Sequence, residues 1–314
     1  MRRLFIYFTM RKKSSTALRN LSFKSQSAME YLTTYAWAIL ILAIVLVAIF
    51  ELNLFNPNTF APKAQPGSCS VQRNSFGGAT LSGGGCNQIP KYVAYFAGNG
   101  ASGSYSSNTY VLATAPSLAG TNQPFTLTMW IYVPNVPNNL DNTPVFGLQS
   151  YQAFEIFRGG QGTSDQLFLH RCSSADTGES ALPLMGLNSW HFIAVSVNNP
   201  NYYFQLDGSG TSTTNTNSYS NNQNVVIGTQ TSQCDGSVFT GDISNVQLYN
   251  VSLSGNDIMA LYQEGIGGAP IAMQNLVGWW PLNDNANDYS GNGNNGVANS
   301  IFYTASWTSG YTQP

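Results

Sequence analysis

The 314-residue sequence is poor in charge and in the side chains that usually hold metals. Charged residues make up only 8% of the chain, which has 2 histidines and 4 cysteines. No two cysteines form a CxxC pair, and His170 and His191 are not spaced as zinc ligands, so no structural zinc site is expected. The low charge, with 30 glycines and 17 tyrosines, is instead typical of short β-strands joined by polar loops.

Acidic residues are missing from the first 25 positions. Seven of the 12 Lys and Arg residues precede Gln26, whereas all 14 Asp and Glu residues follow it. Without this basic leader, 5 basic residues remain against 14 acidic ones, which is a net charge of −9. Because binding to phosphates requires a basic surface, nucleic acid is excluded as a partner.

Charge is also absent from Tyr31 to Phe50, a run of 20 residues without proline or glycine. As a helix rising about 1.5 Å per residue, the run spans roughly 30 Å, the thickness of the hydrocarbon core of a bilayer. The basic residues that precede it predict a cytoplasmic N-terminus and an extracellular C-terminal region. The sequence therefore predicts a single-pass protein of the cell membrane.

The cysteines follow the apolar run, at Cys69, Cys86, Cys172 and Cys234. In an oxidising exterior we expect two disulfides, Cys69–Cys86 and Cys172–Cys234. The alternative is four buried free thiols. The sequon Asn250-Val-Ser252 makes Asn250 a candidate for glycosylation.

An acid stands at the start of the apolar run, at Glu30. An acid at the edge of a membrane helix is costly unless it is paired or lies at the interface. Glu30 could therefore simply contact water at the interface. The string Gln26-Ser-Ala-Met-Glu30-Tyr31-Leu32 supports a second role, because it resembles the class III signal of archaeal type IV pilin precursors.

The pilin resemblance implies a processing step and an assembly step. A prepilin peptidase would cleave between Ser25 and Gln26, so that residues 1–25 are a leader. Residues 26–55 would then be a transmembrane helix that can also pack in a filament core. In such a core Glu30 would pair with the new α-amino group of a neighbouring pilin subunit, since a buried carboxylate is tolerated when paired.

Beyond the helix, residues 56–91 are rich in proline and glycine and predict a linker that contains Cys69 and Cys86. From Tyr92 the pattern changes to short β runs, which predicts an all-β sandwich or jelly roll. We expect strands at residues 92–96, 125–133, 144–148, 154–157, 166–170, 190–197, 202–206, 225–228 and 242–249. Ser254-Gly-Asn-Asp257 is a capping box and predicts one helix that stops at Gly265.

Four motifs occur in the order found in laminin-G-like, concanavalin-A-like jelly rolls, and the chain resembles this family over residues 92–266. They are Phe125-Thr-Leu-Thr-Met-Trp130, Leu187-Asn-Ser-Trp190-His191, Phe204-Gln-Leu-Asp207-Gly208 and the strand and helix within 239–262. Residues 276–303 resemble the segment that normally opens this domain. We therefore expect residues 267–314 to supply a permuted first strand, the alternative being a truncated second copy.

The laminin-G resemblance also implies candidate ligands. Such domains often bind calcium on a loop rim, and Asp284, Asp288 and Asn292, with Asn294 nearby, form an oxygen-rich loop that Asp235 and Asp242 could join. The alternative is that these residues only make turns. Trp279 and Trp280 alternate on a strand, so one of them should face outward. Trp280 is thus a candidate to stack on a sugar or to form an interface.

We therefore expect a pilin-like adhesion or structural protein whose extracellular head binds glycan or protein. Its expected partners are the membrane, the prepilin peptidase and other pilin subunits. The alternative is a membrane-anchored surface lectin that does not polymerise. Catalysis is not expected, because glycosidases need two carboxylates facing one bond and no Glu-x-Asp-x-x-Glu run exists; a carbohydrate-active enzyme is the third alternative.

Overall fold

The computed structural model describes residues 16–51, 61–98, 109–134, 143–149, 154–158, 167–171, 185–216, 218–221, 223–229 and 239–314. The chain divides into two compact units, Met1–Phe60 and Ala61–Pro314. The second unit is called the head below.

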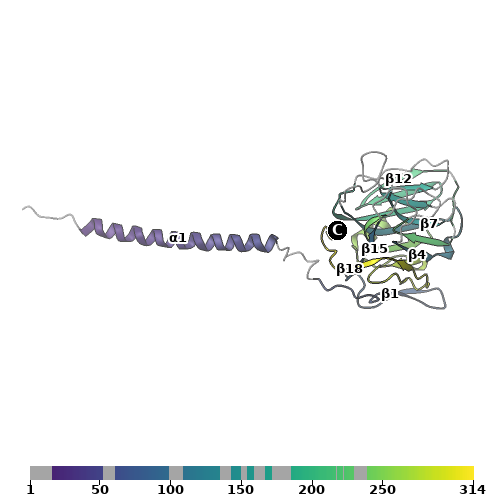
Figure 1. The fold of residues 1–314 in the computed structure, drawn as a ribbon, viewed down its shortest axis with the longest axis horizontal. Coiled ribbons are helices and arrows are strands. Elements are labelled where there is room, and N and C mark those ends of the chain that lie inside the picture. Colours follow the sequence, from purple (N-terminus) through teal and green to yellow (C-terminus); the bar gives the residue numbers. More distant parts are fainter. Residues whose placement is uncertain are drawn as a thin grey trace, which may run out of the picture. The chain divides into compact units, whose positions relative to one another are not determined.

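The first unit contains one long helix, α1 (Thr16–Glu51), which is continuous over 36 residues (Figure 1). Within it, Met29–Ile49 is long and apolar enough to cross a membrane, and none of this stretch is buried. This agrees with the expected apolar helix. The helix starts before Gln26, however, so the bond between Ser25 and Gln26 lies inside a continuous helix.

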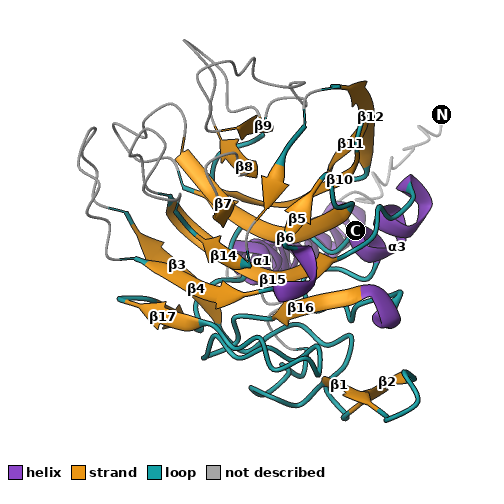
Figure 2. Cartoon of the chain, turned by 90° about the vertical axis from the view of Figure 1, so that its right-hand side faces the viewer, coloured by secondary structure: helices purple, strands orange, loops and turns teal. Residues whose placement is uncertain are grey.

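The head is a sandwich of two antiparallel sheets (Figure 2). The large sheet has eight strands. Seven of them follow in the order β12 (Ser209–Thr214), β11 (Asn201–Leu206), β10 (Ser189–Asn198), β6 (Phe125–Val133), β15 (Thr240–Tyr249), β3 (Val93–Ala97) and β18 (Phe302–Thr304). The eighth, β16 (Leu276–Trp280), pairs with β15. The small sheet has six, in the order β17 (Val297–Asn299), β4 (Tyr110–Thr114), β14 (Asn224–Ile227), β7 (Thr143–Gln149), β8 (Phe154–Arg158) and β9 (Leu167–Arg171).

Shorter elements complete the head. Two ribbons lie outside the main sheets: β1 (Ser70–Arg73) with β2 (Ala79–Ser82), and β5 (Gly120–Thr121) with β13 (Ser220–Asn221). Among the described residues of the head, the helical segments are η1 (Pro116–Leu118), α3 (Gly255–Gln263) and η2 (Met273–Asn275). The predicted capping box of α3 is confirmed, because the side chains of Ser254 and Asp257 each bond the other's backbone N–H.

Strand β6 shows why the large sheet is buried on both faces. Its alternate residues from Phe125 to Val133 belong to the core between the two sheets. Trp130 points to the other face, into a second core that includes Phe192 and Leu261. Here α3, the disulfide-bonded segment and the C-terminal tail cover the large sheet. The threonines of β6 on this outer face are also buried, and Thr126 donates to the carbonyl oxygen of Val251.

The expected linker, residues 56–91, needs correction from Ala61 onward, because these residues belong to the compact head. The predicted Cys69–Cys86 disulfide is present, with a Cα–Cα distance of 5.0 Å. Arg73 fastens the β1–β2 ribbon to the head by donating to the carbonyl oxygens of Leu276 (2.8 Å) and Met273 (2.9 Å). Charge-assisted hydrogen bonds of this kind hold the segment in place despite its proline and glycine content.

The C-terminal segment takes part in both sheets. Strand β16 pairs with β15, β17 pairs with β4, and β18 pairs with β3, all antiparallel. Residues 267–314 thus supply strands to the sandwich, as the permutation hypothesis requires. Whether β16 replaces the usual first strand of such a domain stays a prediction.

Candidate functional site

The expected calcium loop is a hydrogen-bonded structural loop. Asp288 Oδ1 accepts the backbone N–H groups of Trp279 (2.9 Å) and Ser290 (2.8 Å). Its Oδ2 accepts the Ser290 hydroxyl (2.8 Å) and the Asn294 N–H (2.9 Å). Both oxygens therefore have two donors, which fills the acceptor capacity that a cation would need.

The other members of the expected calcium set are also directed elsewhere. The Asn292 amide donates to the carbonyl oxygens of Leu276 and Val277, at 2.7 and 2.9 Å. Asp284 acts on Tyr303, whose pKa rises to about 12, mainly through burial and also through this carboxylate. Among the described residues, no group of three His, Cys, Asp or Glu side chains is arranged to hold a metal.

The expectation that Trp280 can stack on a ligand is wrong. Trp280 has no exposed surface, and its indole N–H donates to the carbonyl oxygen of Asn294 (3.0 Å). Trp279, the alternate residue, is buried in the second core. The strand has a packed layer on each face, so neither ring reaches solvent. Gly278, which precedes Trp279, leaves room for the Trp280 ring, since a Cβ there would lie 2.1 Å from that ring.

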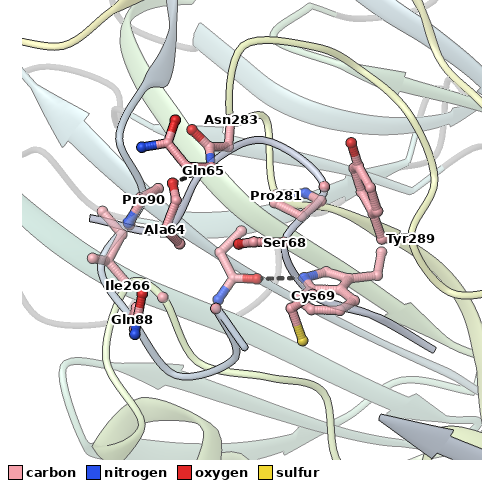
Figure 3. A pocket seen from close by; sticks show the side chains of 15 residues that line it. Ala64, Gln65, Ser68, Cys69, Gln88, Pro90, Ile266, Pro281, Asn283 and Tyr289 are labelled. Atoms are coloured by element: carbon pink, nitrogen blue, oxygen red, sulfur yellow. Dashed lines mark hydrogen bonds between the residues drawn. The ribbon is translucent and has the colours of Figure 1, made fainter. Parts of the chain in front are cut away.

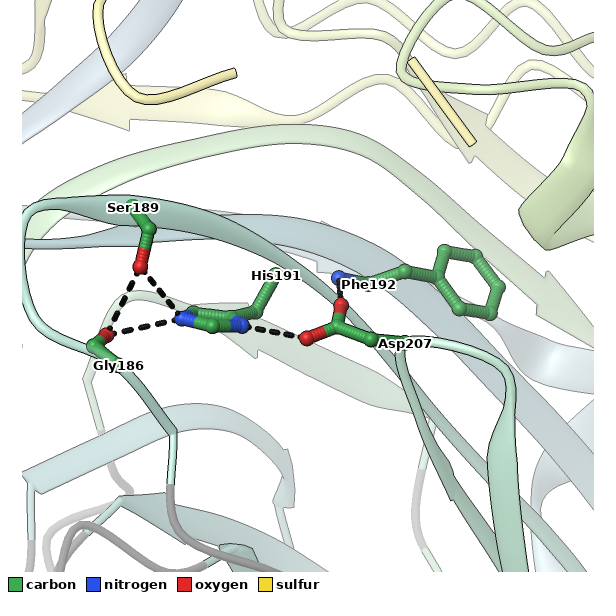
Figure 4. Close-up of polar contacts among 5 residues, drawn as sticks. All are labelled: Gly186, Ser189, His191, Phe192 and Asp207. Atoms are coloured by element: carbon green, nitrogen blue, oxygen red, sulfur yellow. Dashed lines mark hydrogen bonds and ion pairs between the residues drawn. The ribbon is translucent and has the colours of Figure 1, made fainter. Parts of the chain in front are cut away.

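A cluster that the sequence only partly indicated joins His191 to the tip of the β11–β12 hairpin (Figure 4). Nδ1 of His191 lies 2.6 Å from Asp207 Oδ2, and Nε2 lies 2.8 Å from the Gly186 carbonyl oxygen. Asp207 Oδ1 also accepts the Phe192 N–H. Asp207 and Gly208 both have positive φ, 47° and 82°, as a tight two-residue hairpin requires.

Ser189, His191 and Asp207 are arranged like the nucleophile, base and acid of a catalytic triad, because Ser189 Oγ lies 2.9 Å from His191 Nε2. The Gly186 carbonyl argues against catalysis. This oxygen can only accept, and the Ser189 hydroxyl donates to it (3.1 Å), so the hydroxyl hydrogen is directed at Gly186 rather than at His191 Nε2. The cluster therefore fixes the hairpin.

Two hollows of the head are lined by residues that the structure describes. The first, beneath the disulfide-bonded segment, has a volume of about 40 Å³. Figure 3 shows Gln65, Ser68 and Asn283 around it. This is room for a few water molecules and far below the volume of a usual ligand pocket. The second, of about 230 Å³, is lined by hydroxyl and amide side chains of β10, β11, β12 and the turn after β15, including Asn201, Tyr203 and Ser252.

Among the described residues, Asp242 is a titratable group that has a buried polar atom without a hydrogen-bond partner. It lies on β15, its strand neighbours are Tyr95 and Tyr132, and its Oδ1 is buried with no hydrogen-bond partner among the described residues. Burial raises the pKa of Asp242 from 3.8 to about 7, because the carboxylate loses water without gaining a partner. The fold thus favours the neutral form, and ionisation reduces stability as pH rises from about 4 to 7.

The roles expected for several residues in processing, assembly, glycosylation and disulfide bonding stay predictions. Glu30 is exposed on α1, and Thr34 donates to its carbonyl oxygen. Only the backbone of Ser25 and Gln26 is described. Asn250 is exposed directly after β15. Cys172, Cys234 and Asp235 lie outside the described residues.

This double-sheet architecture, with its aromatic strands and Asp-Gly hairpin, is that of a concanavalin A-like, laminin-G-like domain. Residues 105–259 match a laminin G family model described as the concanavalin A-like lectin/glucanases superfamily. No curated protein sequence matches the chain significantly.

Solved structures resemble the chain at the level of the fold. A putative carbohydrate binding protein from Bacteroides ovatus is 16% identical, with a TM-score of 0.50 over 72% of this chain and 66% of that one. A heptameric SAP-like pentraxin from Limulus polyphemus is 15% identical, with a TM-score of 0.47 over 68% of this chain and 94% of the pentraxin.

Proposed function

We propose that this protein is anchored by α1 in the cell membrane and displays a glycan-binding head outside the cell. The observation that carries the proposal is the concanavalin A-like sandwich, which bears a disulfide and follows an apolar helix of membrane-spanning length. Disulfides form in oxidising compartments, in agreement with an extracellular head. The hydrogen bond from the Ser189 hydroxyl to the Gly186 carbonyl oxygen favours binding over hydrolysis.

A glycan array tests the binding activity. We expect the full-length protein to bind a subset of glycans, with the same signals in EDTA and in calcium, because Asp288 is occupied by backbone donors. A head that binds no glycan in either buffer would refute the proposal and leave a structural or protein-binding role.

We further propose pilin-like processing and assembly, on the class III signal at Gln26 to Leu32. Mass spectrometry of the protein from its native membrane should find Gln26 as the first residue. The variant Glu30→Gln should still be cleaved but should form fewer filaments, since it cannot offer a carboxylate to a neighbouring α-amino group. A mature protein that retains residues 1–25 contradicts this assembly and favours the anchored lectin that does not polymerise.

A further inference from the structure

Four side chains form a row across the outer face of the large sheet. Phe302 on β18 pairs with Tyr95 on β3, and Tyr95 pairs with Asp242 on β15. Asp242 in turn pairs with Tyr132 on β6. Directly opposed residues of antiparallel strands have Cβ atoms about 4.5–5.5 Å apart on the same face. The carboxylate therefore stands between two tyrosines, with a phenylalanine beyond one of them.

Along this row, the outer face of the large sheet changes from covered by other segments to exposed. Tyr132 is partly buried and its ring lies 5.8 Å from that of Trp190, which Trp307 covers in turn. On the other side of Asp242, Tyr95 is 36% exposed and Phe302 is 63% exposed. Among the described residues of the head, Phe76 is the only other aromatic residue with an exposed side chain. Two of the three most exposed aromatic rings of the described head thus lie in this row, Tyr95 next to Asp242 and Phe302 next to Tyr95.

The chemistry of the row limits what can bind there. Asp242 Oδ1 is buried without a donor, so the described residues leave part of the hydrogen-bonding capacity of this carboxylate unfilled. Calcium needs six to eight oxygen ligands, and no metal-binding group of side chains includes Asp242 among the described residues. An acidic ligand is disfavoured by the head, which has 5 basic against 12 acidic residues. Neutral hydroxyl groups beside an apolar surface satisfy both the carboxylate and the rings.

We propose that Asp242, Tyr95 and Phe302 bind a neutral sugar residue, which deepens the proposed glycan-binding function and rests on it. One hydroxyl group of the sugar donates to the carboxylate of Asp242, which is a partly exposed residue. The apolar face of the sugar ring packs on the side chain of Tyr95, and Phe302 extends this surface to the edge of the sheet.

The test is a calorimetric titration of the full-length protein in a detergent without a sugar headgroup. The probes are maltose, cellobiose, lactose and mannobiose, with sialyllactose as the acidic comparison. We expect at least one neutral disaccharide to bind and sialyllactose to bind more weakly. Asp242→Asn and Tyr95→Ala should each weaken that binding at least tenfold, and Phe302→Ala severalfold.

Two matched variants distinguish this site from the rest of the surface of the head. Phe76→Ala removes an open aromatic ring elsewhere on the head and should leave the affinity unchanged. Asn201→Ala alters the hydroxyl-lined hollow and should also leave it unchanged. Asp242→Asn should raise the melting temperature at pH 8 and leave it unchanged at pH 4, which shows that the variant is folded.

Each result bears on the site. Unchanged affinity in Asp242→Asn and Tyr95→Ala overturns the site while leaving the glycan-binding function intact. Loss of affinity in Asn201→Ala alone assigns the sugar to the hollow and overturns the site as well. A wild-type protein that binds none of the neutral disaccharides and no neutral glycan on the array overturns the site, and one that binds no glycan at all overturns both the site and the glycan-binding function.

Discussion

A chain that lacks residues 270–314 is expected to have an unfolded head. The deletion removes one strand from the small sheet and two from the large one. It also removes Trp280 from the core between the sheets, and Trp307 and Tyr311 from the outer core. Loss of one buried tryptophan side chain costs about 3–5 kcal/mol, whereas a whole domain is stable by only about 5–15 kcal/mol. Circular dichroism and limited proteolysis should show no cooperative melting of the head.

The control is a deletion of residues 312–314, which are exposed and follow Tyr311. This shorter protein should melt within a few degrees of the full chain. A protein without residues 270–314 that melts like the full chain would contradict the permuted-strand hypothesis and support the truncated second copy. Trp280→Ala gives an intermediate test, with a large loss of stability expected from one side chain.

The strands of the central sandwich could be predicted because each has a strong apolar pattern. The expected strand at residues 125–133 coincides with β6, which is buried on nearly its whole length. Strands β12 and β17 could not be predicted in the same way. Strand β12 is made of Ser, Thr and Gly, and β17 has three residues. Both are set by pairing with a neighbouring strand rather than by their own composition.

The candidate site was harder to predict, because its residues acquire their properties from distant partners. Alternation predicts that one of Trp279 and Trp280 faces solvent, but it assumes that only one face of the strand is covered. The disulfide-bonded segment and the C-terminal tail cover the second face. Asp242 is likewise an ordinary strand residue in sequence. Burial raises the pKa of its carboxyl, and its strand neighbours Tyr95 and Tyr132 come from strands far away in the chain.

A substitution in the loop after β16 is expected to cause the second large loss of stability. Asp288→Ala should destabilise the head by about 3 kcal/mol, because the backbone N–H groups of Trp279, Ser290 and Asn294 all lose their acceptor. For a domain of this size, such a loss lowers the melting temperature by about 5–10 °C. Thermal melting followed by circular dichroism measures the change.

Asp288→Asn is the matched variant, and it separates a structural carboxylate from a calcium ligand. Its single carbonyl oxygen can still accept the Trp279 and Ser290 N–H groups, so about half of the loss should remain. Since all four donors are satisfied without a metal, millimolar calcium should leave the melting temperature of the wild type unchanged. A calcium-dependent rise in the wild type that disappears in both variants would restore the calcium site and require the loop to rearrange on binding. Without such a rise, the role of Asp288 is to close the free edge of β16, where Asn292 and Asn294 bond the carbonyl oxygens that a further strand would otherwise occupy.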